Sequence, residues 1–172
     1  MELERRDLLK KVASLLIGAI SLFIPLGAGT KFLLDPLRRK SPEQGFIRVT
    51  SVDSLPMGMP RRFTVEGKRT DAWNTYEDEP IGSVYLIRRA DKVDAFQVIC
   101  PHAGCFVNYE TTKRRFLCPC HGSSFRLDGS VAEAASPAPR GLDELDVEVQ
   151  GNDVYVRYQK FQQGTKEKIA LS

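Results

Sequence analysis

CPHAGC at residues 100–105 and CPCHGS at residues 118–123 are the two most informative stretches of this chain. The 172 residues include 4 cysteines and 2 histidines, and all of these lie between residues 100 and 121. Thiolates favour iron–sulfur clusters and zinc, whereas imidazole binds zinc, copper and iron. Residues with unrelated roles are not expected to gather in this way, so the pattern indicates one metal centre.

Six donors are too many for one four-coordinate ion, and they divide into two similar pairs. Cys100 with His102 forms one pair, and Cys118 with His121 forms the other. A [2Fe-2S] cluster has four terminal positions, which two cysteines and two histidines fill. With neutral imidazoles the oxidised cluster has no net charge, so an electron enters more easily than it does with four thiolates. Potentials of such centres are about −150 to +300 mV, against about −400 mV for plant-type clusters.

The histidines predict that a proton accompanies the electron. A ferric neighbour acidifies imidazole more than a ferrous one does, so the centre is expected to take up a proton on reduction near neutral pH. Quinols lose electrons and protons together and are suitable donors. The remaining thiols, Cys105 and Cys120, fit a disulfide that joins the two stretches. Because disulfides persist in oxidising compartments, we expect the domain to work outside the cytoplasm.

Two other interpretations of the six residues are less favoured. A structural zinc site with two cysteines and two histidines usually spaces its paired ligands by two or more residues, and it needs no further thiols. A disulfide scaffold with incidental histidines does not explain why both histidines lie beside cysteines.

The two stretches resemble those of the Rieske iron–sulfur proteins, and residues 45–158 resemble the same family more loosely. The resemblance implies that Cys100 and Cys118 bind the inner iron. It implies that His102 and His121 bind the outer, redox-active iron, and that the other two cysteines form a disulfide. In the family, the histidine at the position of His121 contacts the quinol.

Three further positions are interpreted through this resemblance. Ser123 matches a serine whose hydroxyl donates to a bridging sulfide, which raises the potential. Phe125 departs from the family, because high-potential members have a tyrosine there that donates to a cysteine sulfur. We therefore expect a lower potential, matched to a quinol such as menaquinol. Pro137, within SPAP at 136–139, resembles the proline-rich loop that covers the cluster and that proline stiffens; an ordinary surface turn is the alternative.

Composition sets the remaining bounds. A chain of 172 residues suits one globular domain with an appendage, and its 42% hydrophobic and 27% charged residues are ordinary for a folded protein. The net charge of +3 is mild, and no run of Lys and Arg is interleaved with aromatic residues. A nucleic-acid partner is therefore not expected.

The appendage is the N-terminal segment. Residues 12–30 contain no charged side chain, and as a helix they would extend roughly 28 Å, about one bilayer core. Pro25 is expected to kink such a helix, and Gly27 and Gly29 to weaken its far end. We expect residues 1–34 to form a retained transmembrane anchor, with a cleaved signal peptide as the alternative.

Arg5 and Arg6 precede this segment and resemble a twin-arginine export signal, with Leu8 where phenylalanine is usual. That pathway exports folded proteins, which suits a cofactor inserted in the cytoplasm. Basic residues flank both ends of the segment, so their distribution does not decide the orientation. The twin arginines and the expected disulfide predict an N-terminus inside and a domain on the outer side of the cytoplasmic membrane.

The rest of the chain predicts an all-β domain. Residues 35–45 are polar and form the expected tether, 46–160 the Rieske domain with cluster loops at about 100–106 and 118–125, and 161–172 a polar tail for which disorder is the simplest expectation. Short strands rich in β-branched and aromatic residues are expected at 46–49, 63–66, 84–88, 95–99, 106–109, 115–117, 145–149 and 154–158. Gly151 suggests a hairpin turn, and Trp73 suggests core or partner packing. The expected architecture is an antiparallel β sandwich with a cluster-binding sub-domain.

The resemblance implies the Rieske subunit of a membrane quinol–cytochrome c oxidoreductase of the cytochrome bc type. Such a chain takes an electron and a proton from quinol and passes the electron to a c-type cytochrome, without turnover of its own. Its expected partners are a cytochrome b subunit, a c-type cytochrome, quinol and membrane lipid, in a dimeric complex. The alternative is the small Rieske subunit of an arsenite-oxidase-type molybdenum enzyme, which has no quinol contact. Membrane retention discriminates between the two. A dioxygenase ferredoxin is disfavoured, because those proteins are cytoplasmic and lack the extra cysteine pair.

Overall fold

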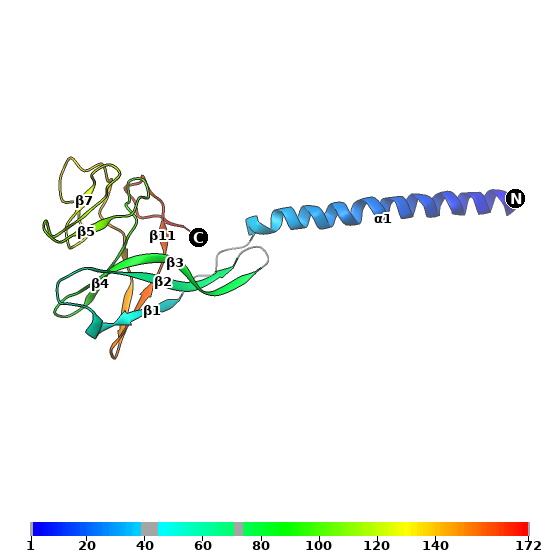
Figure 1. The fold of residues 1–172 in the computed structure, drawn as a ribbon. Coiled ribbons are helices and arrows are strands. Elements are labelled where there is room, and N and C mark those ends of the chain that lie inside the picture. The colour runs from blue at the N-terminus through cyan, green and yellow to red at the C-terminus, as the bar shows by residue number, and fades with distance from the viewer. Residues whose placement is uncertain (1, 39–44, 71–73, 172) are drawn as a thin grey trace. The chain divides into compact units, whose positions relative to one another are not determined.

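The computed structural model describes residues 2–38, 45–70 and 74–171, in two compact units. The first unit is a helix and the second is a β domain (Figure 1). Trp73 and residues 39–44 of the predicted tether lie outside the described residues.

The N-terminal unit is the helix α1 (Glu2–Arg38), which has 37 residues. A helix of that length is about 55 Å long, so it exceeds a bilayer core of about 30 Å, and about 20 of its residues suffice to cross that core. Its span Glu4–Asp35 is long and apolar enough to cross a membrane, and its most apolar 18 residues have a mean hydropathy of 2.0. None of those 18 residues is buried against the rest of the protein. The helix continues past Pro25 and ends at Arg38. Residues 35–38, the first residues of the predicted tether, are therefore helical.

The β domain confirms the predicted all-β class, and every strand pair described is antiparallel. One sheet has the order β1 (Phe46–Ser51), β10 (Asp153–Arg157), β9 (Val147–Gln150). A second has the order β2 (Arg61–Thr70), β3 (Thr75–Arg88), β4 (Val93–Gln97), β8 (Glu144–Leu145). A third has the order β5 (Asn108–Glu110), β6 (Arg115–Leu117), β7 (Ser124–Phe125). The last pairs β11 (Lys160–Phe161) with β12 (Ala170–Leu171).

Strands β3 and β4 are central because their side chains alternate between two hydrophobic cores. Val84 and Leu86 belong to the first core, whereas Tyr85 and Ile87 belong to the second, and all four are at most 5% exposed. Successive side chains of a strand point to opposite faces, so an unbroken run of buried residues means that both faces are covered. The first core includes side chains of β10, and the second includes those of β6 and β7.

Tyr85 joins the central sheet to the smaller sheet β5–β6–β7. Its ring packs on Phe116 of β6, with centroids 4.9 Å apart. Its hydroxyl donates to the Val107 carbonyl oxygen at 3.3 Å and accepts from the Tyr109 amide at 3.1 Å. The small sheet therefore has a defined position on the larger one.

Several predicted elements have different limits in the structure. The turn at Gly151 is confirmed, with φ of 62° between β9 and β10. A 3-10 helix, η1 (Val52–Ser54), follows β1. The strand expected at 145–149 is divided at Asp146, because β8 pairs in the second sheet and β9 in the first. Disorder was the wrong expectation for residues 161–171, because Phe161 is 4% exposed and β11 pairs with β12.

Replacing Tyr85 with phenylalanine tests the junction between the sheets. The change keeps the ring but leaves the half-buried Tyr109 amide and the buried Val107 carbonyl without this partner, which we expect to lower the free energy of unfolding by about 1–3 kcal/mol. Urea titration of the full chain followed by circular dichroism measures this. The half-buried Tyr155 is the control, and its phenylalanine variant is expected to differ from the parent by less than about 0.5 kcal/mol. Equal stability of the two variants would contradict the role of the Tyr85 hydroxyl in joining the two sheets.

Candidate metal centre

The two hexapeptides form loops with the same backbone pattern. In the first, the Cys100 amide donates to the Cys105 carbonyl at 2.8 Å and the Gly104 amide donates to the Cys100 carbonyl at 3.0 Å. In the second, the Cys118 amide donates to the Ser123 carbonyl at 2.8 Å and the Gly122 amide donates to the Cys118 carbonyl at 3.1 Å. Each loop therefore closes between its first and sixth residues.

A glycine with positive φ occupies the fifth position of both loops. The φ angles are 80° at Gly104 and 75° at Gly122, a region that side-chain-bearing residues rarely adopt. The sequence already contained this signal as the glycine shared by CPHAGC and CPCHGS. Its role in reversing the chain beside each metal-binding pair becomes clear only from the loop geometry.

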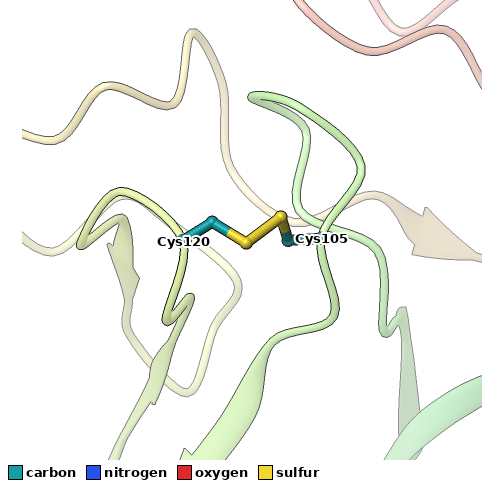
Figure 2. The surroundings of a disulfide bond; sticks show 2 residues. All are labelled: Cys105 and Cys120. Atoms are coloured by element: carbon teal, nitrogen blue, oxygen red, sulfur yellow. A yellow bond between two sulfur atoms is a disulfide. The ribbon is translucent and has the colours of Figure 1, made fainter.

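Strand pairing and a disulfide hold the loops together. Ile99 pairs with Phe106 at the base of the first loop, and Leu117 pairs with Ser124 at the base of the second. The predicted bond between Cys105 and Cys120 is present, with Cα atoms 6.5 Å apart, and it bridges the loops (Figure 2). The strand expected at 106–109 is shorter than predicted and begins at residue 108, so Phe106 belongs to the base of the loop.

The other two cysteines are free and buried. Cys100 is 1% exposed and Cys118 is 2% exposed, and both belong to the second core. Burial raises the pKa of the Cys100 thiol and the neighbouring Cys118 raises it further, although contacts with the His102 amide and the Ser123 hydroxyl lower it. Two thiolates here would repel each other in the absence of a cation, so the pair suits a metal ion, whose binding displaces the protons.

Both sulfur atoms of the disulfide lie close to the sulfur of Cys118. The Sγ atoms of Cys105, Cys118 and Cys120 lie within 4.8 Å of one another. Because Cys105 and Cys120 are bonded to each other, they have no thiolate to offer. The free donors in the loops are therefore the two buried thiols and the two histidines.

The histidines lie together at the surface end of the loops. Their ring centroids are 4.8 Å apart and their planes are nearly perpendicular, at 86°. The Nδ1 atom of His102 is buried and has no hydrogen-bond partner in the described residues. His121 is exposed. A buried ring nitrogen without a partner is costly unless it binds something, so its position suits a metal ligand.

Ser123 is the last residue of the second loop, and Phe125 lies in β7 directly after it. Ser123 is 0% exposed, and its Oγ has no hydrogen-bond partner in the part of the chain that the structure describes. Phe125 is 0% exposed in the second core and has no polar atom to donate. The hydroxyl of Ser123 is thus available to donate to an acceptor bound at the loops.

The segment 136–139 is anchored at one point. Ala138 is 8% exposed and belongs to the second core with Cys100 and Cys118, whereas Pro137 beside it is exposed. The sequence singled out Pro137, but the buried neighbour is the residue that fixes this loop.

The family of the chain follows from comparison with known proteins. A family model described as the Rieske [2Fe-2S] domain matches residues 45–154. The chain belongs to the Rieske family. Its cofactor is accordingly a [2Fe-2S] cluster, and the zinc and disulfide-scaffold interpretations are set aside.

Similar Rieske proteins include iron–sulfur subunits of a menaquinol:cytochrome c reductase and of a cytochrome b6-f complex. The "menaquinol:cytochrome c reductase iron-sulfur subunit" of Bacillus subtilis (strain 168) is 33% identical over 142 residues, which are 80% of each chain. The "cytochrome b6-f complex iron-sulfur subunit" of Chlorobaculum thiosulfatiphilum is 24% identical over 156 residues, covering 91% of this chain and 76% of that protein. A crystal structure of a plasma membrane Rieske protein from Synechocystis PCC 6803 covers 65% of this chain and 99% of its own, with 24% identity and a TM-score of 0.46.

Replacing both Cys105 and Cys120 with alanine tests the cross-link. The bond closes a sequence separation of 15 residues, and loss of such a link is expected to cost about 3 kcal/mol of stability. Thermal unfolding and the visible absorbance of the bound cluster measure the effect, and the variant should lose its cluster at a lower temperature than the parent. Retention of the cluster to the parent's melting temperature would show that strand pairing alone holds the loops.

Proposed function

We propose that the chain is the electron-transfer subunit of a membrane quinol–cytochrome c oxidoreductase, with menaquinol as donor and a c-type cytochrome as acceptor. The observation that favours this is the order of exposure across the two loops. The thiols of Cys100 and Cys118 are at most 2% exposed, whereas His121 is exposed. The histidine end is thus open to a partner. The names of similar proteins, such as that of Bacillus subtilis, support a quinol-linked complex.

The ligand assignment is part of the proposal. Cys100 and Cys118 would bind the inner iron, and His102 and His121 the outer one. The free state of both buried thiols and the unpartnered Nδ1 of His102 support it. When bound, a [2Fe-2S] cluster accepts one electron at a time, which couples a two-electron quinol to a one-electron cytochrome.

The role proposed for His121 is to hold a proton. Its exposed imidazole can accept a hydrogen bond from a quinol hydroxyl through the ring nitrogen that does not bind metal. When the quinol is oxidised, that nitrogen would take up the hydroxyl proton, and the electron would pass to the bound cluster. His102 is only partly exposed and lies edge-on against His121, so it supports the orientation of the outer ring.

Two residues are proposed to set the potential in opposite directions. The buried Ser123 hydroxyl would donate to a sulfide and stabilise added negative charge, which raises the potential. Phe125 has no hydroxyl, so the donation that a tyrosine would make is missing. The net effect is a potential suited to menaquinol. Pro137, exposed beside the buried Ala138, would belong to a stiff cover over one side of the centre.

The location follows the same proposal. Helix α1 would be retained as a single membrane anchor, with Arg5 and Arg6 inside as an export signal and the β domain on the outer side. Residues 35–45 would tether the domain, although α1 includes the first of them and ends only at Arg38. Its partners would be a cytochrome b subunit and a c-type cytochrome in a dimeric complex within membrane lipid, with no turnover by this chain alone.

Purification from detergent-solubilised membranes tests this function. The full chain, with its helix, should be recovered with b- and c-type cytochromes. Adding menaquinol to the oxidised complex should reduce the c-type cytochrome, and deletion of this chain should abolish that reduction. The expected electron paramagnetic resonance spectrum of the reduced complex is that of a nitrogen-ligated [2Fe-2S] cluster. Recovery of a soluble chain that lacks residues 1–30 and accompanies a molybdenum enzyme would support the alternative instead.

The Phe125→Tyr variant tests the proposed determinant of potential. A hydroxyl that donates to a cysteine sulfur should raise the midpoint potential by about 40 mV, the one-electron equivalent of about 1 kcal/mol. Redox titration with electron paramagnetic resonance detection measures the shift. Phe116→Tyr adds the same atom to another buried ring of the second core and should leave the potential within about 10 mV of the parent. An unchanged potential in the Phe125 variant would remove this residue from the explanation.

A further inference from the structure

The C-terminal segment folds back onto the domain as a hairpin. Strands β11 and β12 pair at its open end, and the Gln162 amide donates to the Ile169 carbonyl at 2.8 Å. Phe161 anchors the hairpin in the first core and is 4% exposed. Lys168 lies over the Phe161 ring, with Nζ 4.6 Å from the centroid. The strand pairing and the buried Phe161 therefore fix both ends of the turn at residues 162–169.

The turn of this hairpin contacts the first cluster loop. The Gly164 amide donates to the carbonyl of Pro101 at 2.8 Å. A Cβ at Gly164 would lie 3.7 Å from the His102 carbonyl oxygen, and one at Gly104 would lie 3.8 Å from the Gln163 side chain. Gly164 has φ of 75°, so a glycine is required where the turn presents its amide to the loop.

Arg140 holds the turn from the other side. Its Nη1 donates to the Thr165 carbonyl at 2.6 Å and its Nη2 donates to the Gln162 carbonyl at 2.9 Å. Nε and Nη2 also donate to the two carboxylate oxygens of Asp143, each at 2.8 Å. The side chains of Arg140 and Asp143 are only 10% and 4% exposed, so water competes little for these bonds.

The Arg140–Asp143 pair is itself fixed to the central sheet. The Asp143 carbonyl accepts from the amide of Gln97, the last residue of β4, at 2.8 Å. Arg140 directly follows Pro139, the last residue of the segment 136–139. One guanidinium thus links the central sheet, the proline-containing segment and the C-terminal hairpin.

We propose that Arg140 is a positioning residue for the metal centre. It holds the hairpin as a strap whose Gly164 amide fixes the Pro101 carbonyl, and because that carbonyl is part of the Pro101–His102 peptide, the strap also fixes the backbone at His102. The disulfide ties the first loop at Cys105, and the strap ties it at Pro101, on the other side of the histidine. This inference rests on the proposed role of His102 as a cluster ligand.

The Arg140→Met variant of the full chain, purified with its cluster in detergent, tests the strap. We expect its cluster to be lost to EDTA about fivefold faster than the parent's, the factor that corresponds to one ordinary hydrogen bond. The reduced electron paramagnetic resonance signal should broaden, because the His102 ring samples more orientations. Exchange of the Gly164 amide with deuterium should accelerate together with cluster loss.

Arg89→Met is the matched control. Arg89 also pairs with a buried aspartate, Asp94, at 2.7 Å and donates to a backbone carbonyl, that of Leu127, at 2.6 Å. Neither contact involves the hairpin, so the control should retain its cluster and signal as the parent does. Equal acceleration in both variants would reveal general loosening of the domain and overturn the proposal.

A truncation that ends at Phe161 covers the case in which Arg140→Met does not fold. It keeps the buried anchor and the Arg140–Asp143 pair, and residues 162–171, which it removes, are exposed or half-buried. The same faster cluster loss and broader signal are expected. If the truncated chain keeps the parent's release rate and line shape, the strap has no positioning role. These measurements need no quinol, so they distinguish an error about the strap from an error about the electron donor. If menaquinol is not the donor, the parent and the variants should still differ in cluster retention as described.

Discussion

The shared use of one sheet by two cores is the constraint on which the rest of the structure depends. Strands β3 and β4 place alternate side chains into each core, so neither face of the sheet is solvent-exposed there. The second core includes the two free thiols as well as aromatic rings such as Phe116. The two thiols proposed as iron ligands are therefore part of the packing itself, and their positions are as well defined as those of the buried side chains around them.

The two short loops that contain these thiols share one backbone conformation. In each, the amide of the first residue bonds to the carbonyl of the sixth, and a glycine with positive φ turns the chain. Strand pairs close the loops at their bases, and the disulfide links them across the site. The site therefore passes from two buried thiols to an exposed histidine, an arrangement that suits the proposed transfer of an electron at its exposed end.

The contacts around the first loop show how a small site recruits distant parts of the chain. Tyr85 ties the small sheet to the central one through its hydroxyl. Arg140 satisfies carbonyls of the C-terminal hairpin while it pairs with Asp143. Because buried polar groups require partners, each of these side chains restricts the conformations available to the backbone that it contacts. Rigidity near the metal centre thus comes from residues that are not its ligands.

The sequence by itself determined the all-β class, the apolar N-terminal segment and the two metal-binding hexapeptides, because strand patterns, hydropathy and ligand spacing are local properties. It also indicated the pairing of Cys105 with Cys120, since six donors exceed four terminal positions. Only the tertiary structure divided 145–149 between two sheets and packed 161–171 against the first loop. These outcomes depend on contacts between residues far apart in the chain. A polar segment such as QQGTKEK contains no local sign that its amides and carbonyls meet Pro101 and Arg140.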